Sequence, residues 1–147
     1  MIIAYATDQP KEQGMTTTEI HNTERVTKIF EAFGRGDVAY ILDQLADDAR
    51  FVSHLDPIVP WAGEFSGKDN VAQFFQALGG SVDVTDHPVN AVVAQDDTVV
   101  AMGDVSFSVR ETGKIGSSSW VYIFKLANGQ VQSYDQFNDT GLAEAFR

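Results

Sequence analysis

Two side chains in the first half of the sequence could take a proton from a bound molecule. His54 is one of three histidines in the chain, and an unperturbed histidine is largely neutral at pH 7 and able to act as a general base. Asp56 precedes Pro57, and apolar neighbours such as Trp61 would raise its pKa toward the range of a base. Each also has a simpler interpretation. His54 could be a partly exposed residue at the end of a strand, and Asp56 could form a turn, since Asp-Pro commonly begins one.

Two tyrosines near the C-terminus could supply the other half of such chemistry. The hydroxyls of Tyr122 and Tyr134 can donate a hydrogen bond to an oxygen that gains negative charge during a reaction. The remaining histidines are expected to lie outside the site. His21 lies ahead of the apolar stripe of the first predicted helix and should be solvated, and His87, which precedes a proline, is expected to begin a strand.

No motif in the sequence indicates a metal or a cofactor. Three scattered histidines without paired carboxylates at ligand spacing do not form a metal site. The sequence also lacks a glycine-rich phosphate loop and a serine nucleophile motif. Because the chain has no cysteine, thiolate chemistry is excluded as well. The sequence therefore predicts that any activity works without a cofactor.

The composition limits the partners. The formal net charge of −11 argues against binding to nucleic acid or to an anionic membrane, because contacts to phosphate need a basic surface. We see no apolar run long enough to span a bilayer and no signal peptide, so a cytoplasmic protein is expected.

The length of 147 residues predicts one domain that can bury a core. Residues 1–18 are predicted to be a loose N-terminal arm, because most of them are polar and lack periodicity, and residues 19–147 are predicted to form the domain. Alternatively, Ile2, Ile3 and Tyr5 could add a strand to a sheet edge or to a partner subunit.

The spacing of apolar residues places helices before strands. Stripes at i, i+3, i+4 and i+7 predict three amphipathic helices. They begin at the expected N-caps Asn22, Asp37 and Ser66 and end near Gly34, Asp47 and Gly79. Alternating apolar residues predict strands at about residues 49–55, 83–94, 98–112, 116–126 and 130–138. Asn128-Gly129 is the strongest hairpin signal, and Asp139 should cap a short C-terminal helical turn.

This order of elements predicts an α+β fold in which a curved, mostly antiparallel sheet forms a cone. About three N-terminal helices should pack on its concave face. Three short helices cannot fill such a sheet, so a cavity is expected inside it. Sheet area beyond the helices would allow a homodimer that forms through the sheet.

Several segments resemble the nuclear transport factor 2-like superfamily and, more narrowly, its SnoaL-like, ketosteroid-isomerase-related members. These segments are Leu45-Ala46-Asp47-Asp48-Ala49, Trp61-Ala62-Gly63-Glu64-Phe65-Ser66-Gly67 with Phe74-Phe75, Asn128-Gly129-Gln130-Val131, and Gln136-Phe137-Asn138-Asp139-Thr140. The resemblance covers about residues 22–146 and implies the cystatin-like cone. This fold hosts isomerases, cyclases, epoxide hydrolases, dehydratases and binding modules without activity, so it does not define one function.

The residues that steroid isomerases use are not intact in this chain. By the resemblance, Ile29 stands where those enzymes place an oxyanion tyrosine, and Ser53 stands where they place the general-base aspartate. Their second oxyanion donor, a protonated aspartate, corresponds to about Tyr122. We therefore predict that any chemistry is not steroid isomerisation.

The resemblance also implies which residues face the interior of the cone. It turns the faces that carry Trp120 and Tyr134 inward, and it places Gln136 where relatives often have a glutamate. The expected ligand-binding residues are Ile29, Phe33, Ser53, Trp61, Phe74, Phe75, Leu78, Trp120, Tyr134, Gln136 and Asn138.

Two functions remain open at this stage. In the first, an isomerase, cyclase or hydrolase acts on a small apolar molecule, with His54 or Asp56 as base and Tyr122 or Tyr134 as hydrogen-bond donor. In the second, the cone binds a hydrophobic molecule or supports dimerisation without catalysis.

Overall fold

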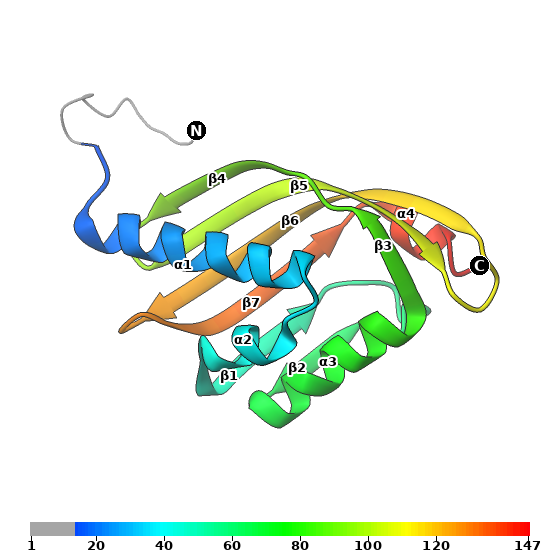
Figure 1. Cartoon of the computed structure of the whole chain (residues 1–147), viewed down its shortest axis with the longest axis horizontal. Helices are drawn as coiled ribbons and strands as arrows, with labels where there is room; N and C mark the ends of the chain where they lie inside the picture. The colour runs from blue at the N-terminus through cyan, green and yellow to red at the C-terminus, as the bar shows by residue number, and fades with distance from the viewer. Residues whose placement is uncertain (1–13) are drawn as a thin grey trace.

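The structure is a computed structural model that describes residues 14–147 and has the predicted α+β architecture (Figure 1). Its elements are α1 (Thr17–Gly34), α2 (Val38–Asp43), β1 (Leu45–Ser53), β2 (Gly63–Ser66), α3 (Lys68–Ser81), β3 (Val82–Asp86), β4 (Val89–Gln95), β5 (Thr98–Val109), β6 (Ile115–Ala127), β7 (Gln130–Asn138) and α4 (Thr140–Glu144). The suggested strand at Ile2, Ile3 and Tyr5 and most of the predicted arm lie outside the described residues.

The first helix begins earlier than predicted. Thr16, not Asn22, is the N-cap: its hydroxyl accepts the N–H of Glu19 at 3.1 Å, and the Glu19 carboxylate accepts the N–H of Thr16 at 2.9 Å. This reciprocal capping box satisfies two helix-end donors at once. Glu19 also accepts the N–H of Asp96 at 2.8 Å, which ties the start of α1 to the turn between β4 and β5. Asn22 is instead buried on the inner face of the helix.

The boundary between α2 and β1 also differs from the prediction. Asp37 caps α2 as expected, but the helix ends at Asp43 and the strand starts at Leu45. Leu45 pairs with Val131 of β7, and the register shifts before the next paired residue, Arg50.

The third helix starts and ends differently from the prediction. Gly67 is its N-cap, with a φ of 86° and no side-chain capping bond, so the predicted capping box at Ser66 is wrong. The predicted stop at Gly79-Gly80 is wrong too, because the helix continues to Ser81. The Ser81 hydroxyl donates to the carbonyl of Ala77 inside the last turn.

The strand predicted at residues 83–94 is divided into β3 and β4. The break falls at His87-Pro88, and Pro88 has no N–H to donate to a neighbouring strand. Both pieces pair with β5: β4 with residues 98–103 and β3 with residues 106–109.

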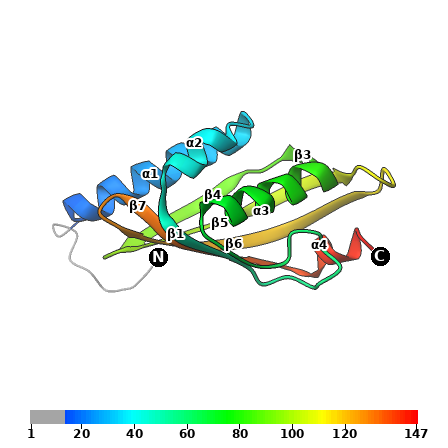
Figure 2. The ribbon, with the colours of Figure 1, turned by 90° about the horizontal axis from the view of Figure 1, so that it is seen from below.

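The seven strands form one curved sheet in the order β2-β1-β7-β6-β5-β3, with β4 also paired to β5. All neighbours are antiparallel except β1 and β7, which are parallel. Figure 2 shows α1, α2 and α3 on one side of the sheet, with the short α4 at its far end. The predicted curved sheet with helices on its concave face is therefore confirmed, with α4 as a fourth helix.

The core lies between the concave face of the sheet and these helices. On β6, Trp120, Tyr122 and Phe124 are buried while the residues between them are more exposed, as alternation on a strand requires. Within residues 14–147, no helix is both long and apolar enough to cross a membrane.

Candidate functional site

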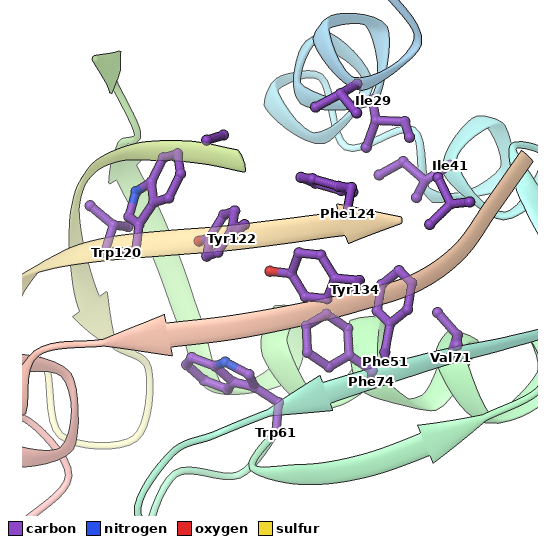
Figure 3. Packing of buried hydrophobic residues seen from close by; sticks show 14 of the residues in the cluster. Ile29, Ile41, Phe51, Trp61, Val71, Phe74, Trp120, Tyr122, Phe124 and Tyr134 are labelled. Atoms are coloured by element: carbon purple, nitrogen blue, oxygen red, sulfur yellow. The ribbon is translucent and has the colours of Figure 1, made fainter. Parts of the chain in front are cut away.

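Aromatic side chains line the concave face of the sheet. Figure 3 shows Trp120, Tyr122 and Phe124 in a row along β6, with Tyr134 of β7 and Phe51 of β1 beside them. The ring centroids of Trp120 and Tyr122 lie 4.0 Å apart, and those of Phe51 and Tyr134 lie 4.5 Å apart. The helices cover this aromatic surface without filling all of the space above it.

Two cavities remain between the helices and the sheet. The main cavity has a volume of about 50 Å³ and is lined by Ile29, Phe30, Phe33, Ile41, Phe51, Phe74, Phe75, Leu78, His87, Tyr122, Phe124, Tyr134 and Gln136. The second cavity has a volume of about 30 Å³ and is lined by Phe33, Trp61, Leu78, Val82, Val84, His87, Val105, Phe107, Tyr122, Gln136, Asn138 and Leu142. The shared lining residues Phe33, Leu78, His87, Tyr122 and Gln136 make them adjoining compartments.

His87 and Tyr122 form a polar pair on the wall between the compartments. His87 Nε2 lies 3.1 Å from the Tyr122 hydroxyl oxygen, which is hydrogen-bond distance. The imidazole stacks on Trp120 with ring centroids 4.7 Å apart and planes 10° apart. Trp120 is fixed in turn, because its indole N–H donates to the carbonyl of Asp104 at 2.8 Å.

The bend between β3 and β4 places His87 at this position. The Asp104 N–H donates to the carbonyl of Pro88 at 3.1 Å, which holds the bend against β5. Gly103 permits this approach, since a Cβ there would lie 2.1 Å from the Pro88 carbonyl oxygen and 2.5 Å from Trp120 Cζ2. A glycine inside a strand commonly marks such a close approach of another backbone.

A chain of buried polar groups continues along β7. The Tyr134 hydroxyl donates to Gln136 Oε1 at 3.2 Å, and Gln136 Nε2 donates to Asn138 Oδ1 at 2.8 Å. Ser53 is buried and its hydroxyl lies 3.4 Å from the same Gln136 oxygen, while Asn138 donates to Ser118. These contacts fix the orientation of each amide and leave little of the network free.

Burial sets the protonation states inside the site. Desolvation lowers the pKa of His87 below its ordinary value, so the imidazole is neutral at physiological pH. Burial raises the pKa values of Tyr122 and Tyr134 well above the ordinary value for tyrosine, so both hydroxyls keep their protons. The site therefore holds a neutral imidazole next to a neutral phenol.

The structure places His54 outside these two compartments. Ser53 faces the interior, so His54, the next residue, lies on the convex side of the sheet. There His54 Nε2 lies 2.8 Å from the Asp135 carboxylate, and its ring stacks on Phe137 at 4.4 Å. His54 thus lies outside these two compartments and, together with Asp56, borders a separate hollow beside α4.

Asp56 is also outside the two compartments. Its carboxylate accepts the N–H of Ile58 at 2.9 Å and pairs with Arg147 at 2.7 Å. These two contacts, with the N–H of Ile58 first, lower the pKa of Asp56, which is opposite to the expected rise. A carboxylate that holds its proton less tightly than usual is a poorer base.

Most of the other predicted site residues do line the compartments. Ile29, Phe33, Phe74, Phe75, Leu78, Tyr122, Tyr134 and Gln136 border the main cavity, and Trp61 and Asn138 border the second. Trp120 lies beneath His87, and Ser53 contacts the cavity wall through Gln136. Among residues 14–147, no three His, Cys, Asp or Glu side chains gather as metal ligands would.

His87 is a site residue that no pattern in the sequence singled out. Two local signals could have indicated its position: the Pro88 that follows it, which interrupts a predicted strand, and the isolated Gly103 in the strand against which the bend packs. Neither signal names a histidine as functional. Only the fold brings its ring to the Tyr122 hydroxyl.

Similar solved structures define the class of fold. An NTF2-like protein from Burkholderia xenovorans matches with a TM-score of 0.79 and 27% identity, covering 91% of this chain and 100% of that one. An NTF2-like protein from Burkholderia thailandensis matches with a TM-score of 0.77 and 25% identity, covering 90% and 99%. A Xanthomonas campestris protein, provisionally named a polyketide cyclase, has a TM-score of 0.72 and 22% identity, with 89% and 100% covered. The chain therefore has the NTF2-like fold.

The family is narrower than this fold. The chain matches the SnoaL-like domain over residues 26–134, most of its length, and it belongs to the SnoaL-like family. The comparison with curated proteins finds no match.

Proposed function

We propose that the two compartments bind a small apolar molecule that carries a carbonyl group, and that His87 and Tyr122 transfer a proton on it without a cofactor. The observation that carries this proposal is the 3.1 Å contact between a neutral imidazole and a phenol in a mainly apolar cavity. The reaction would be of the isomerase or cyclase type, in which a proton leaves carbon next to a carbonyl.

In the proposed mechanism His87 carries the proton and Tyr122 binds the carbonyl oxygen. We assign the His87 proton to Nδ1, so that in the free protein the Tyr122 hydroxyl donates to His87 Nε2. When a ligand binds, its carbonyl oxygen takes that hydrogen bond, and the lone pair of Nε2 becomes free to accept a proton from the adjacent carbon. The C–H electron pair moves into the enolate, and Tyr122 stabilises the charge on oxygen. Return of the proton from His87 to a different carbon completes an isomerisation.

The size of the cavities implies that the wall moves when a ring-shaped ligand binds. The main compartment, at about 50 Å³, is smaller than the roughly 150 Å³ of an engineered cavity that admits benzene. Phe33 and Phe75 are partly buried wall residues, as are Phe30 and Leu78, so these side chains can turn outward at less cost in packing than fully buried ones.

Fold-level similarity is consistent with this reaction class but does not define it. A protein from Bacillus subtilis, provisionally named an isomerase, matches with a TM-score of 0.77 and 17% identity. The match covers 89% of this chain and 96% of that one. At such identity the likeness concerns the fold, and the assignment of chemistry to this chain depends on His87 and Tyr122.

Exchange of the α-protons of cyclohexanone in D₂O, followed by NMR, tests the proposal. We expect the protein to accelerate exchange above the buffer rate, and His87→Gln and Tyr122→Phe each to reduce the protein-dependent rate by about 100-fold. His21→Gln, on the exposed face of α1, is the matched control and should behave like the wild type. Wild-type exchange at the buffer rate would contradict the assignment of proton transfer.

A binding protein without catalysis is the second candidate, and one observation favours it. No carboxylate lines either compartment within the described part of the chain, so His87 would be the sole base. Saturable shifts of cavity resonances by cyclohexanone, together with exchange at the buffer rate, would support this candidate over the enzyme.

We also propose that the chain forms a homodimer through the convex face of its sheet. That face presents apolar side chains that are half-buried or exposed in the single chain, including Val100, Met102, Val121, Ile123 and Phe137. Their exposure in water is unfavourable, and a second copy would cover them. Sedimentation at several protein concentrations measures this association.

A further inference from the structure

One buried donor in the second compartment has no partner. Trp61 is 3% exposed, and its indole Nε1 makes no hydrogen bond within residues 14–147. Trp120 provides the internal contrast, because its Nε1 donates to the carbonyl of Asp104 at 2.8 Å. A buried N–H without an acceptor is uncommon in folded proteins and indicates a missing partner.

The position of Trp61 shows where that partner would sit. The ring borders the second compartment, whose other walls are mainly apolar side chains of β3, β5 and α4. In Figure 3 the nitrogen-bearing edge of the indole is turned toward β7, the strand that carries Gln136 and Asn138. Packing against Phe146, with ring centroids 5.8 Å apart, holds the indole from another side.

The chemistry of the donor limits what can bind. An indole N–H donates and cannot accept, so its partner must be an acceptor such as a carbonyl, ether or hydroxyl oxygen. Each nearby amide has one of its two N–H groups engaged, Gln136 Nε2 with Asn138 and Asn138 Nδ2 with Ser118. The single N–H of Trp61, by contrast, makes no hydrogen bond within residues 14–147, so an acceptor in this compartment gains most by pairing with Trp61.

We propose that the second compartment is a subsite for a second oxygen atom of the ligand, which Trp61 binds through its indole N–H. This inference rests on the proposed function, in which the first oxygen binds at Tyr122. Tyr122 borders both compartments and Trp61 borders the second, so we place one oxygen of the ligand at each of these two donors. The ligand class is then a small apolar ring compound with two separated oxygen functions.

A matched pair of ketones tests the subsite. 4-Methoxycyclohexanone and 4-ethylcyclohexanone have nearly the same shape, but only the methoxy compound has an acceptor at the far end. We compare their protein-dependent exchange rates and their dissociation constants on the wild type and on Trp61→Phe, which keeps an aromatic ring and loses the N–H. The methoxy-to-ethyl preference should fall about five-fold or more in the variant, as expected for loss of one hydrogen bond.

A second measurement needs no variant. The chain has two tryptophans, so the wild type gives two indole N–H resonances. We expect 4-methoxycyclohexanone to shift the Trp61 resonance further downfield than 4-ethylcyclohexanone does, while both ketones should affect the Trp120 resonance alike because its N–H is already bonded.

The outcomes separate this inference from the proposed function. If both ketones bind with a preference that Trp61→Phe leaves unchanged, the subsite is refuted and the proposed cavity stands. An unmoved Trp61 resonance in the presence of bound methoxy compound has the same meaning, since an ordered water would then hold the N–H. If neither ketone binds the wild type, the proposed function fails and the subsite fails with it.

Discussion

Replacing Gly103 by alanine tests how the chain holds His87 in place. The added Cβ would lie 2.1 Å from the Pro88 carbonyl oxygen and 2.5 Å from Trp120 Cζ2. Contact between non-bonded heavy atoms is comfortable only at about 3.5–4.0 Å, so the Pro88 carbonyl must retreat by more than about 1 Å. A change of rotamer cannot relieve this clash, because one of the two atoms belongs to the backbone.

The expected loss of stability follows from two contributions. Overpacking of a well-packed interior costs about 1–3 kcal/mol. Retreat of Pro88 also removes the hydrogen bond from the Asp104 N–H, now 3.1 Å long, which contributes about 1 kcal/mol. We therefore expect Gly103→Ala to lower the free energy of unfolding by about 2–4 kcal/mol. His87 moves with Pro88, so proton exchange should fall to the level of His87→Gln.

Urea denaturation and the cyclohexanone exchange assay measure both effects. Gly79→Ala is the matched control: Gly79 lies inside α3, and a Cβ there would meet nothing within 4 Å. That substitution should stabilise the protein by about 0.5–1 kcal/mol, because alanine favours a helix over glycine. A Gly103→Ala protein that unfolds at the wild-type urea concentration and keeps its exchange rate would show that Gly103 does not hold His87 in place.

Three further predictions concern other parts of the molecule. Because burial lowers the pKa of His87, the exchange rate should be constant near neutral pH and fall on acidification with a midpoint below the ordinary histidine value, which NMR titration of the His87 ring checks. Hydrogen bonds from the N–H groups of Thr16 and Asp96 lower the pKa of Glu19 in the folded protein. Ionised Glu19 therefore stabilises the fold above the pKa of Glu in the unfolded chain, and this stabilisation is lost as the pH falls through the pKa of Glu19 in the folded protein. The urea midpoint should consequently drop less steeply between pH 6 and pH 3 in Glu19→Gln than in the wild type. Phe137→Glu places a charge on the convex face and should raise the dimer dissociation constant at least ten-fold, and an unchanged sedimentation profile would exclude this face as the interface.

The sequence predicted the fold well because the apolar spacing is regular over long segments. The stripe at Val26 and Ile29 and the alternation from Trp120 to Phe124 both survive in the structure as buried faces. The prediction failed at boundaries where local chemistry is ambiguous. The sequence pattern places the end of the second helix at Asp47-Asp48. Both residues instead lie in β1, where the register with β7 shifts and the alternation of buried and exposed side chains is lost.

The candidate site was harder to predict because successive residues of a strand point to opposite faces of the sheet. An error of one residue therefore moves a side chain from the cavity to the outer face. Ser53 and His54 are neighbours in the sequence, yet Ser53 contacts Gln136 inside the cone and His54 contacts Asp135 outside it. For His87 the error has the opposite direction, because it was expected outside the site and lies on the cavity wall. Its place in the cavity depends on a bend at Pro88 and on the space left by Gly103, and both are tertiary features that no local pattern specifies.

The position of His87 has a consequence for how a ligand must be oriented. The resemblance to steroid isomerases would put the base near the end of β1, but this chain has Ser53 there, and its hydroxyl is directed to Gln136. The base proposed here lies at the end of β3, and β1 and β3 belong to opposite halves of the strand order. A carbonyl bound at Tyr122 must therefore present its acidic carbon toward the β3–β4 bend and not toward β1. Substrates that suit a base on β1 would place that carbon against the wrong wall, which is the physical reason to expect a reaction other than steroid isomerisation.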